Sequence, residues 1–282
     1  KIKKAINKNT RCICITHFLG RPTNMTEVLK FKKLRGIMIV EDTALSIGSK
    51  INKRFSGTFG DAGAFSFHPV KIITTGEGGA IIVKNKSLLN KIKSIKSFGY
   101  DIADPSKRKI PGNYNINNFG LNYRMNEIES TLGIEELKFI EKKIKIRKKN
   151  YLSLFNKIKD CRNFYILDSK STKKIVSSYY ALTIILNSKS KKYRDNIILS
   201  LKNNNIQTSI YYPHPVPLLN YYKKKYVYNN DSLNGADFIA IIDLLTDDLK
   251  KDGSNSEIKK SLEKALQEGI KNSLPIDYKE TR

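Results

Sequence analysis

Tryptophan is absent from the 282-residue chain, and cysteine, methionine and proline are scarce. No apolar run approaches the roughly 18 residues that indicate a membrane span, so we expect no membrane helix. The first nine residues are polar and basic and lack the apolar core of a signal peptide. Because the chain begins with Lys1 and not with Met, we expect it to be a fragment or to lack its natural start.

Only three cysteines are present, Cys12, Cys14 and Cys161, which is too few for a disulfide framework. The Cys-x-Cys spacing is poor for a tetrahedral zinc site without further Cys or His nearby. We therefore expect no metal, core thiols and a reducing compartment.

Acidic residues are also few, 26 against 52 lysines and arginines, which gives a net charge of +26. Such a charge is compatible with nucleic-acid binding. However, only ten of the basic residues are arginines, the side chains favoured for bidentate recognition of phosphates and bases, and the lysines are spread along the chain. We expect a general compositional bias and no nucleic-acid partner, with a polyanion-binding module as a weaker alternative.

What is present begins with a strand–helix–strand pattern. Residues 11–16 are β-rich, residues 25–34 have a helical pattern closed by Gly36, and residues 37–40 form a second apolar run. This order within about 30 residues predicts a βαβ unit and a parallel sheet. Asp42 follows the second strand, where open α/β sheets bind ligands, so it is either a site carboxylate or the cap of the turn that follows.

A second informative stretch is residues 63–80, which read as strand, loop, lysine, glycine turn and strand. Its lysine, Lys71, is surrounded in sequence by Phe, Ile and Pro. Partial burial would lower the pKa of this lysine and favour the neutral amine, which forms Schiff bases with carbonyl compounds. The plainer interpretation is a solvated loop lysine.

The rest of the chain predicts a helix at residues 87–97, a long ordered loop at 98–121 and one long helix at 125–158. Shorter elements follow, with strands at 177–186 and 206–212 and a helix at 191–203. Residues 238–245 are apolar, and residues 256–271 have a helical pattern. We divide the chain into a partial large domain (1–123), a linking helix (124–160) and a small C-terminal α/β domain (161–282) whose sequence is atypical after about residue 228.

Four separated motifs, in a consistent order, resemble the DegT/DnrJ/EryC1/StrS family of pyridoxal phosphate (PLP)-dependent sugar aminotransferases. They are Ile39-Val-Glu-Asp42, the segment Gly60-Asp61 with Phe65-Ser-Phe-His-Pro-Val-Lys71 and Thr74-Thr-Gly-Glu-Gly-Gly79, Phe119-Gly-Leu-Asn-Tyr-Arg-Met125, and Thr208-Ser-Ile-Tyr-Tyr-Pro-His-Pro-Val-Pro217. The resemblance covers roughly residues 5–228. It implies the type I aminotransferase-like α/β fold, with an incomplete large domain and a mainly parallel sheet.

The resemblance also assigns roles to particular residues. Lys71 matches the lysine that holds the cofactor and later moves a proton. Asp42 matches the carboxylate that keeps the pyridine nitrogen protonated. Ser66 matches the phosphate serine, and Asn122 matches the asparagine that reaches the cofactor of the neighbouring subunit. His214 is either a substrate contact or a turn residue.

The implied reaction moves an amino group from an amino acid, with glutamate expected, to a keto-sugar carried on a nucleotide, for amino-sugar and polysaccharide biosynthesis. We therefore expect a cytoplasmic homodimer with shared active sites. In the related dehydratase branch a histidine replaces the lysine, so the presence of Lys71 disfavours that activity.

Three departures from the family pattern support a second hypothesis, a degenerate or truncated protein that acts as an interaction partner. About a hundred residues that usually precede this part are not in the sequence, and no recognisable closing segment follows residue 228. In addition, Leu45 stands where the family has a glutamine three residues after the aspartate. We interpret His17 and His68 as mainly structural.

Overall fold

The computed structural model describes residues 2–160, 164–167, 171–186, 193–204, 206–226 and 240–242. The chain divides into two compact units, residues 1–144 with 171–178 and residues 145–170 with 179–282. The division falls inside a long helix, α5 (Ile140–Ile158). The separation of residues 124–160 as a linking segment stays a prediction.

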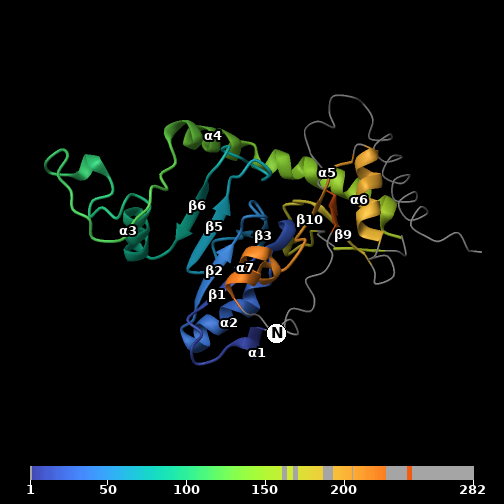
Figure 1. Cartoon of the computed structure of the whole chain (residues 1–282), viewed down its shortest axis with the longest axis horizontal. Coiled ribbons are helices and arrows are strands. Elements are labelled where there is room, and N and C mark those ends of the chain that lie inside the picture. The colour runs from blue at the N-terminus through green and yellow to red at the C-terminus, as the bar shows by residue number, and fades with distance from the viewer. Residues whose placement is uncertain are drawn as a thin grey trace, which may run out of the picture. The chain divides into compact units, whose positions relative to one another are not determined.

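The first unit is built on a four-stranded sheet in the order β1 (Cys12–Thr16), β2 (Met38–Asp42), β5 (Ala62–Ser66) and β6 (Gly79–Val83) (Figure 1). The β1–β2 and β2–β5 pairs are parallel, and the β5–β6 pair is antiparallel. Helix α2 (Met25–Arg35) makes the crossover between β1 and β2, and Gly36 closes it with a left-handed φ of 63°. The predicted βαβ unit and mainly parallel sheet are therefore confirmed.

Smaller elements surround this sheet. They are α1 (Ile2–Ala5), η1 (Phe18–Gly20), the hairpin β3 (Lys50–Ile51) and β4 (Arg54–Phe55), α3 (Lys86–Ile95), η2 (Pro105–Lys107) and β8 (Ile175–Val176), which pairs with β3. The predicted helix at 87–97 is confirmed as α3. The loop at 98–121 is held by aromatic packing, because the Arg108 guanidinium lies over the rings of Tyr100 and Tyr114.

One face of the sheet carries the core of this unit. Ile15 and Ile39 on the strands pack with Met25 and Val28 of α2, and all four are buried. Cys12 and Cys14 lie on the opposite face and are exposed, so the prediction of core thiols is wrong for these two. A single apolar strand does not reveal which of its two faces will be covered. Cys161 lies outside the described residues.

The predicted single helix at 125–158 is two helices, α4 (Glu127–Lys138) and α5. The ladder breaks at Phe139, whose N–H bonds to the carbonyls of Glu136 and Leu137 in a tightened last turn. Helix α4 begins at a capping box formed by Asn126 and Glu129. The apolar periodicity continues across the break, which explains why it predicted one helix.

The second unit has an antiparallel sheet in the order β10 (Thr208–Ile210), β11 (Ala240–Ile242), β9 (Leu182–Leu186) and β7 (Phe164–Ile166). Helices α6 (Arg194–Asn203), α7 (Asn220–Lys225) and η4 (Val216–Leu218) accompany it. The predicted small α/β domain is confirmed in type. The helix predicted at 256–271 lies outside the described residues.

The strand predicted at 177–186 is wrong in its first half, because only residues 182–186 are extended in a sheet. Ser178 N–H and Ser177 Oγ instead donate to the carbonyl of Gly20, at 2.9 and 3.0 Å. Within the described ranges, no helix combines the length and apolarity needed to cross a bilayer.

Candidate active site at the ends of the parallel strands

Three parallel strands end at one edge of the sheet. Thr16, Asp42 and Ala64 are aligned across β1, β2 and β5, and Ser66 ends β5 two residues further on. The carboxyl ends of parallel strands are where open α/β sheets bind ligands. Asp42 and Ser66 therefore stand at the edge where a site is expected.

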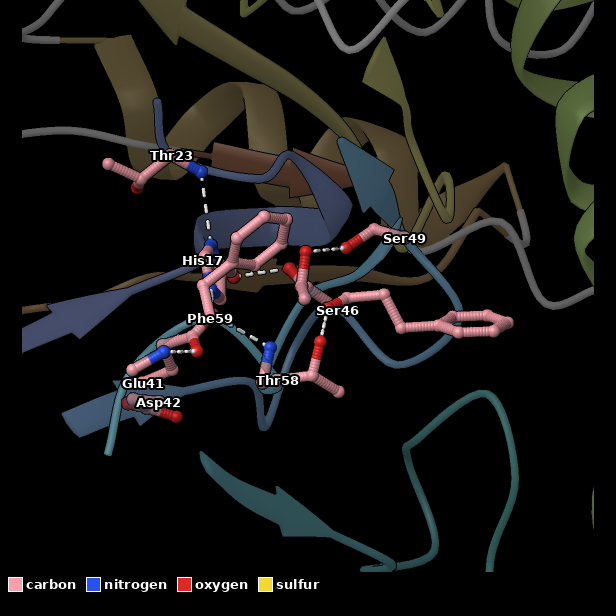
Figure 2. Close-up of polar contacts among 12 residues, drawn as sticks. His17, Thr23, Glu41, Asp42, Ser46, Ser49, Thr58 and Phe59 are labelled. Carbon is pink, nitrogen blue, oxygen red and sulfur yellow. Dashed lines mark hydrogen bonds and ion pairs between the residues drawn. The ribbon is translucent and has the colours of Figure 1, made fainter. Parts of the chain in front are cut away.

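Glu41 and Asp42 are consecutive, so the strand turns their side chains to opposite faces of the sheet. Glu41 faces the packed side and is fully buried. Its Oε2 accepts hydrogen bonds from His17 Nε2 and from the Gly57 N–H, both at 2.8 Å, and its Oε1 accepts from the Gly60 N–H at 2.6 Å. Figure 2 shows this carboxylate beneath the His17 ring.

His17 completes the network. Its Nδ1 accepts the Thr23 N–H at 3.0 Å, so the ring donates through Nε2 to Glu41. The His17 carbonyl accepts the Ser46 hydroxyl, and its N–H donates to the Asp42 carbonyl at 2.9 Å (Figure 2). Burial opposes ionisation of Glu41, but the hydrogen bonds from His17, Gly60 and Gly57 outweigh it and hold its pKa below the ordinary value.

This network ties the end of β1 and the loop before β5 to β2, directly beside Asp42. The structural interpretation of His17 agrees with its position. The sequence did not predict the role of Glu41, because the residues that bond to it lie 16 to 24 positions away in the chain. The one local signal was that Glu41 and Asp42 are adjacent at the end of a strand, where consecutive side chains point to opposite faces.

Asp42 lies on the other face and is half-buried. Its Oδ1 accepts the Ala44 N–H at 3.0 Å. This bond is the turn-capping role that was the alternative for Asp42. Among the described residues, Oδ2 receives no hydrogen bond, so the capping role occupies only one carboxylate oxygen. Asp42 can therefore cap the turn and still accept a hydrogen bond from a ligand.

Lys71 sits in the loop between β5 and β6. Its N–H donates to the His68 carbonyl at 2.9 Å, and the following residues Ile72 and Ile73 are buried. Burial lowers the pKa of Lys71, and the charge of the Asp42 carboxylate opposes this effect only in part. The structure thus brings Lys71 within electrostatic range of Asp42.

The turn after Lys71 is fixed by its own hydrogen bonds. Thr74 Oγ1 donates to the Phe67 carbonyl at 2.9 Å, and the Thr75 N–H donates to the same carbonyl at 3.1 Å. Gly76 and Gly78 have positive φ values of 83° and 140°, which favour glycine. The glycine-rich stretch therefore closes the loop that carries Lys71 between β5 and β6.

Ser66 is half-buried, and its Oγ accepts the His68 N–H in a long contact of 3.4 Å. Among the described residues the Ser66 hydroxyl proton has no acceptor, so it is available to an anion. His68 is exposed and lies 3.8 Å from Glu77, a position that fits a structural or surface role.

For two predicted site residues the described contacts do not bear on the predicted roles. Asn122 is exposed, bridges to Ser97 and accepts a hydrogen bond from Arg124 Nε at 3.1 Å. His214 is exposed in the second unit between Pro213 and Pro215. Their roles stay predictions. Leu45, the departure from the family pattern, is buried at 6% exposure and is part of the core.

A groove of about 710 Å³ lies along the same sheet, lined by β5 and β6, α3 and the start of α4. Its lining includes Ala64, Ile81, Ile92, Tyr123 and Arg124, but not Lys71, Asp42 or Ser66. The candidate site is therefore at the strand ends, where the ionisable and hydroxyl side chains lie, and the groove is a neighbouring surface.

Comparison with known proteins agrees with the resemblance seen in the sequence motifs. The model of the DegT/DnrJ/EryC1/StrS aminotransferase family matches residues 1–243. GDP-perosamine synthase of Escherichia coli O157:H7 is 29% identical over 227 residues, which is 80% of this chain and 58% of that protein. A UDP-4-amino-4,6-dideoxy-N-acetyl-beta-L-altrosamine transaminase of Helicobacter pylori is 28% identical over 84% of this chain and 60% of its own length.

Among solved structures, a sugar aminotransferase of Streptococcus pneumoniae in its PMP form superposes with a TM-score of 0.82. It is 22% identical, and the match covers 96% of this chain and 72% of the other. This likeness establishes the α/β fold of the PLP-dependent aminotransferases. The chain spans about three fifths of the length of the curated relatives it matches.

Proposed function

Because the chain belongs to the DegT/DnrJ/EryC1/StrS aminotransferase family, we propose that it serves PLP-dependent transfer of an amino group to a nucleotide-linked keto-sugar. The amino donor in this proposal is an amino acid, glutamate first, and the setting is amino-sugar biosynthesis for polysaccharides in the cytoplasm. The relatives named as GDP-perosamine synthase and UDP-sugar transaminase support this substrate class. The observation that carries the proposal is the half-buried Lys71 in the loop after β5, whose pKa is lowered by burial and which lies within electrostatic range of Asp42.

The residues at the strand ends suit the cofactor. When bound, PLP supplies an electron sink for negative charge that develops on the substrate carbon. Asp42 Oδ2 would accept a hydrogen bond from the protonated ring nitrogen and so keep that nitrogen charged. The Ser66 hydroxyl would donate to the phosphate, and Lys71 would hold the aldehyde carbon.

Lys71 also suits proton transfer. A lysine is a useful base near neutral pH only when its pKa is lowered towards the working pH. Burial lowers the pKa of Lys71 in this way, and the charge of the Asp42 carboxylate opposes the effect in part. The same Nζ can therefore take a proton from one substrate carbon and return it to another.

A different reaction class also occurs among the relatives. GDP-4-keto-6-deoxy-D-mannose 3-dehydratase of Escherichia coli O55:H7 is 29% identical over 73% of this chain. The lysine at position 71 favours amino transfer over dehydration, because the resemblance implies a histidine at that position in the dehydratase branch.

We further propose that the active form is a homodimer with shared sites. Asn122 lies in the segment that leads into α4, a helix on which Ile128, Leu132 and Leu137 are 84%, 43% and 47% exposed. An apolar helix face of this kind usually marks an interaction surface. A second copy covering α4 would bring Asn122 close to the partner's cofactor.

The decisive experiment is a visible absorption spectrum of the purified chain with saturating PLP. We expect an absorption band that is lost in Lys71→Ala and kept in Lys109→Ala, a matched exposed lysine. Addition of glutamate should remove the band and release 2-oxoglutarate. If no Lys71-dependent band forms at saturating PLP, the chain by itself is not an aminotransferase.

Asp42→Asn tests the second role separately. An amide cannot hold a proton on the ring nitrogen as a carboxylate does, so the band should persist while the glutamate reaction slows by about 100-fold or more, the scale typical of general acid–base groups. Stopped-flow absorbance measures this rate. An unchanged rate would remove Asp42 from the proposal but leave Lys71 in it.

A further inference from the structure

A cluster of positive charge lies at the edge of the first sheet opposite to the candidate site. Asp61 directly precedes β5, and Lys84 directly follows the antiparallel β6. The start of β2 is held at the same edge, because Asp61 Oδ2 accepts the Ile39 N–H at 2.9 Å. Asp42 and Ser66 end β2 and β5 at the other edge. The charged cluster is therefore separate from the residues that we assign to the cofactor.

Three cations from separate elements meet at this edge. Lys32 of α2 forms an ion pair with Asp61. Lys84 Nζ donates to the Phe59 carbonyl at 2.7 Å, and the guanidinium of Arg54, from β4, lies over the Phe59 ring at 4.5 Å. Residues 32, 54 and 84 are far apart in the sequence, so the fold, and not a local run of lysines, brings them together.

The loop between β4 and β5 holds two of these cations in place. Arg54 Nε donates to Thr58 Oγ1 at 3.1 Å, and Arg54 Nη2 donates to the Thr58 carbonyl. The next residue, Phe59, supplies the carbonyl for Lys84. Within the described ranges, neither Arg54 nor Lys84 forms an ion pair with a carboxylate, and Arg54 Nη1 meets no acceptor. Both side chains are oriented and still have donors to offer.

The carboxylates at this edge do not balance the three cations. Both oxygens of Asp61 are already occupied, and the buried Glu41 is bonded to three donors of its own. Burial lowers the pKa of Lys84, and the charges of Arg54 and Lys32 lower it further. The two carboxylates oppose this effect only in part. The cluster therefore carries an excess of positive charge.

The start of α3 adds to this excess. The helix begins at Lys86, two residues after Lys84, and has no acidic residue in its first turn. The first turn of a helix carries a partial positive charge. A guanidinium and ammonium groups around such a point suit an anion with several acceptor oxygens and more than one charge, as in a phosphate group.

We propose that Lys32, Arg54 and Lys84 form a binding site for an inorganic phosphate or diphosphate anion. An inorganic anion fits better than a nucleotide, because Arg54 already covers the Phe59 ring on which a base would stack. The bound anion would link α2, the β3–β4 hairpin and the segment after β6, and so stabilise this end of the sheet. This inference does not rest on the proposed function.

Isothermal titration calorimetry of the whole chain with pyrophosphate tests the site. The titration is done at pH 7 without PLP, in about 0.15 M NaCl to screen diffuse attraction. We expect saturable binding with a dissociation constant below about 1 mM. Lys84→Ala should weaken it by about tenfold or more, because a charge-assisted contact is lost. Lys109→Ala removes the same charge from an exposed residue in the loop at 98–121 and should leave the affinity unchanged.

A second control separates this site from the proposed cofactor site. Ser66→Ala, which removes the hydroxyl assigned to the cofactor phosphate, should bind pyrophosphate as the unaltered chain does. Circular dichroism confirms that each variant is folded. GDP should bind no more tightly than pyrophosphate, since the cluster offers no free ring for the base.

Four results would overturn the proposal. They are no saturation up to about 10 mM pyrophosphate, equal weakening by Lys84→Ala and Lys109→Ala, loss of binding in Ser66→Ala but not in Lys84→Ala, and tighter binding of GDP that depends on Lys84. The second result would show diffuse attraction to the net charge, and the third would place the anion at the strand ends near Lys71. Absence of a Lys71-dependent absorption band would refute the proposed function and leave this site standing.

Discussion

Replacing the buried Glu41 by glutamine should destabilise the first unit strongly. The two side chains have nearly the same shape, but the carboxylate accepts three hydrogen bonds, from His17 Nε2, Gly57 N–H and Gly60 N–H. An amide has one accepting oxygen and one donating nitrogen. If its oxygen serves His17 and Gly57, its nitrogen faces the Gly60 N–H, donor against donor.

The magnitude follows from that count. A hydrogen bond to a charged group contributes about 1.5–3 kcal/mol, and a buried donor left without a partner costs about 1–3 kcal/mol. Since the oxygen can still serve two donors, we expect a loss of about 2–4 kcal/mol at pH 7. With a urea dependence of about 1–3 kcal/mol per molar, a loss of about 3 kcal/mol lowers the midpoint by about 1–3 M.

The effect should depend on pH in a defined direction. The pKa of Glu41 is lowered in the folded chain. The stabilisation is therefore complete above the unfolded value of about 4.3 and is lost as the pH falls through the lower folded value. Glutamine does not titrate, so the difference between the two proteins should be full at pH 7 and narrow below about pH 4.

Urea unfolding followed by circular dichroism at pH 7 and at pH 3.5 measures both quantities. Glu27→Gln is the matched control, because this carboxylate is 62% exposed in a surface pair with Lys30 and should contribute less than about 1 kcal/mol. A loss below about 1 kcal/mol for Glu41→Gln, or a difference that does not narrow in acid, would refute the reasoning.

Two further predictions concern a close backbone approach at Gly63 and a buried hydrogen bond of Arg147. In Gly63→Ala the new Cβ would lie 2.0 Å from the Gly57 carbonyl oxygen, a backbone atom that cannot move aside, so we expect a loss of about 3 kcal/mol or more in urea unfolding. Gly76→Ala meets no atom within 4 Å and should cost only the strain of its positive φ, about 1 kcal/mol. In the second unit, Arg147→Met removes the 2.7 Å hydrogen bond to the buried Tyr180 carbonyl, which should cost about 1–3 kcal/mol and speed amide exchange in that unit. Equal stability of the two glycine variants, or unchanged exchange in Arg147→Met, would contradict these accounts.

The parts of the fold that the sequence predicts correctly depend on local patterns. The βαβ unit follows from two apolar runs separated by a helical period, and Gly36 marks the end of α2 because few other residues adopt its left-handed φ. The loop that holds Lys71 is likewise local, since threonine and glycine residues within ten positions form its turn.

Other features depend on contacts that a local pattern does not contain. The exposure of Cys12 and Cys14 is determined by what covers the sheet. The side-chain alternation within β1 is the same whether the cysteine face is covered or exposed, so it does not predict which face is buried. The break at Phe139 interrupts hydrogen bonds but not the apolar period. His17 and Glu41 meet across 24 residues of sequence, so neither predicts the other.

The adjacent pair Glu41 and Asp42 shows why a strand end can be important for both folding and chemistry. The alternation of side chains along β2 sends Glu41 into the packed face, where its charge is balanced by three donors. It sends Asp42 to the opposite face, where Oδ1 caps the turn and Oδ2 receives no hydrogen bond from the described residues. Because the His17 N–H donates to the Asp42 carbonyl, the Glu41 network also fixes the backbone from which Asp42 projects. Loss of Glu41 should therefore weaken both stability and the proposed cofactor binding, whereas Asp42→Asn, which keeps an oxygen that can cap the turn, should weaken the proposed chemistry alone. If Asp42→Ala, which also removes the capping oxygen, proved as destabilising as Glu41→Gln, the main role of Asp42 would be to cap the turn.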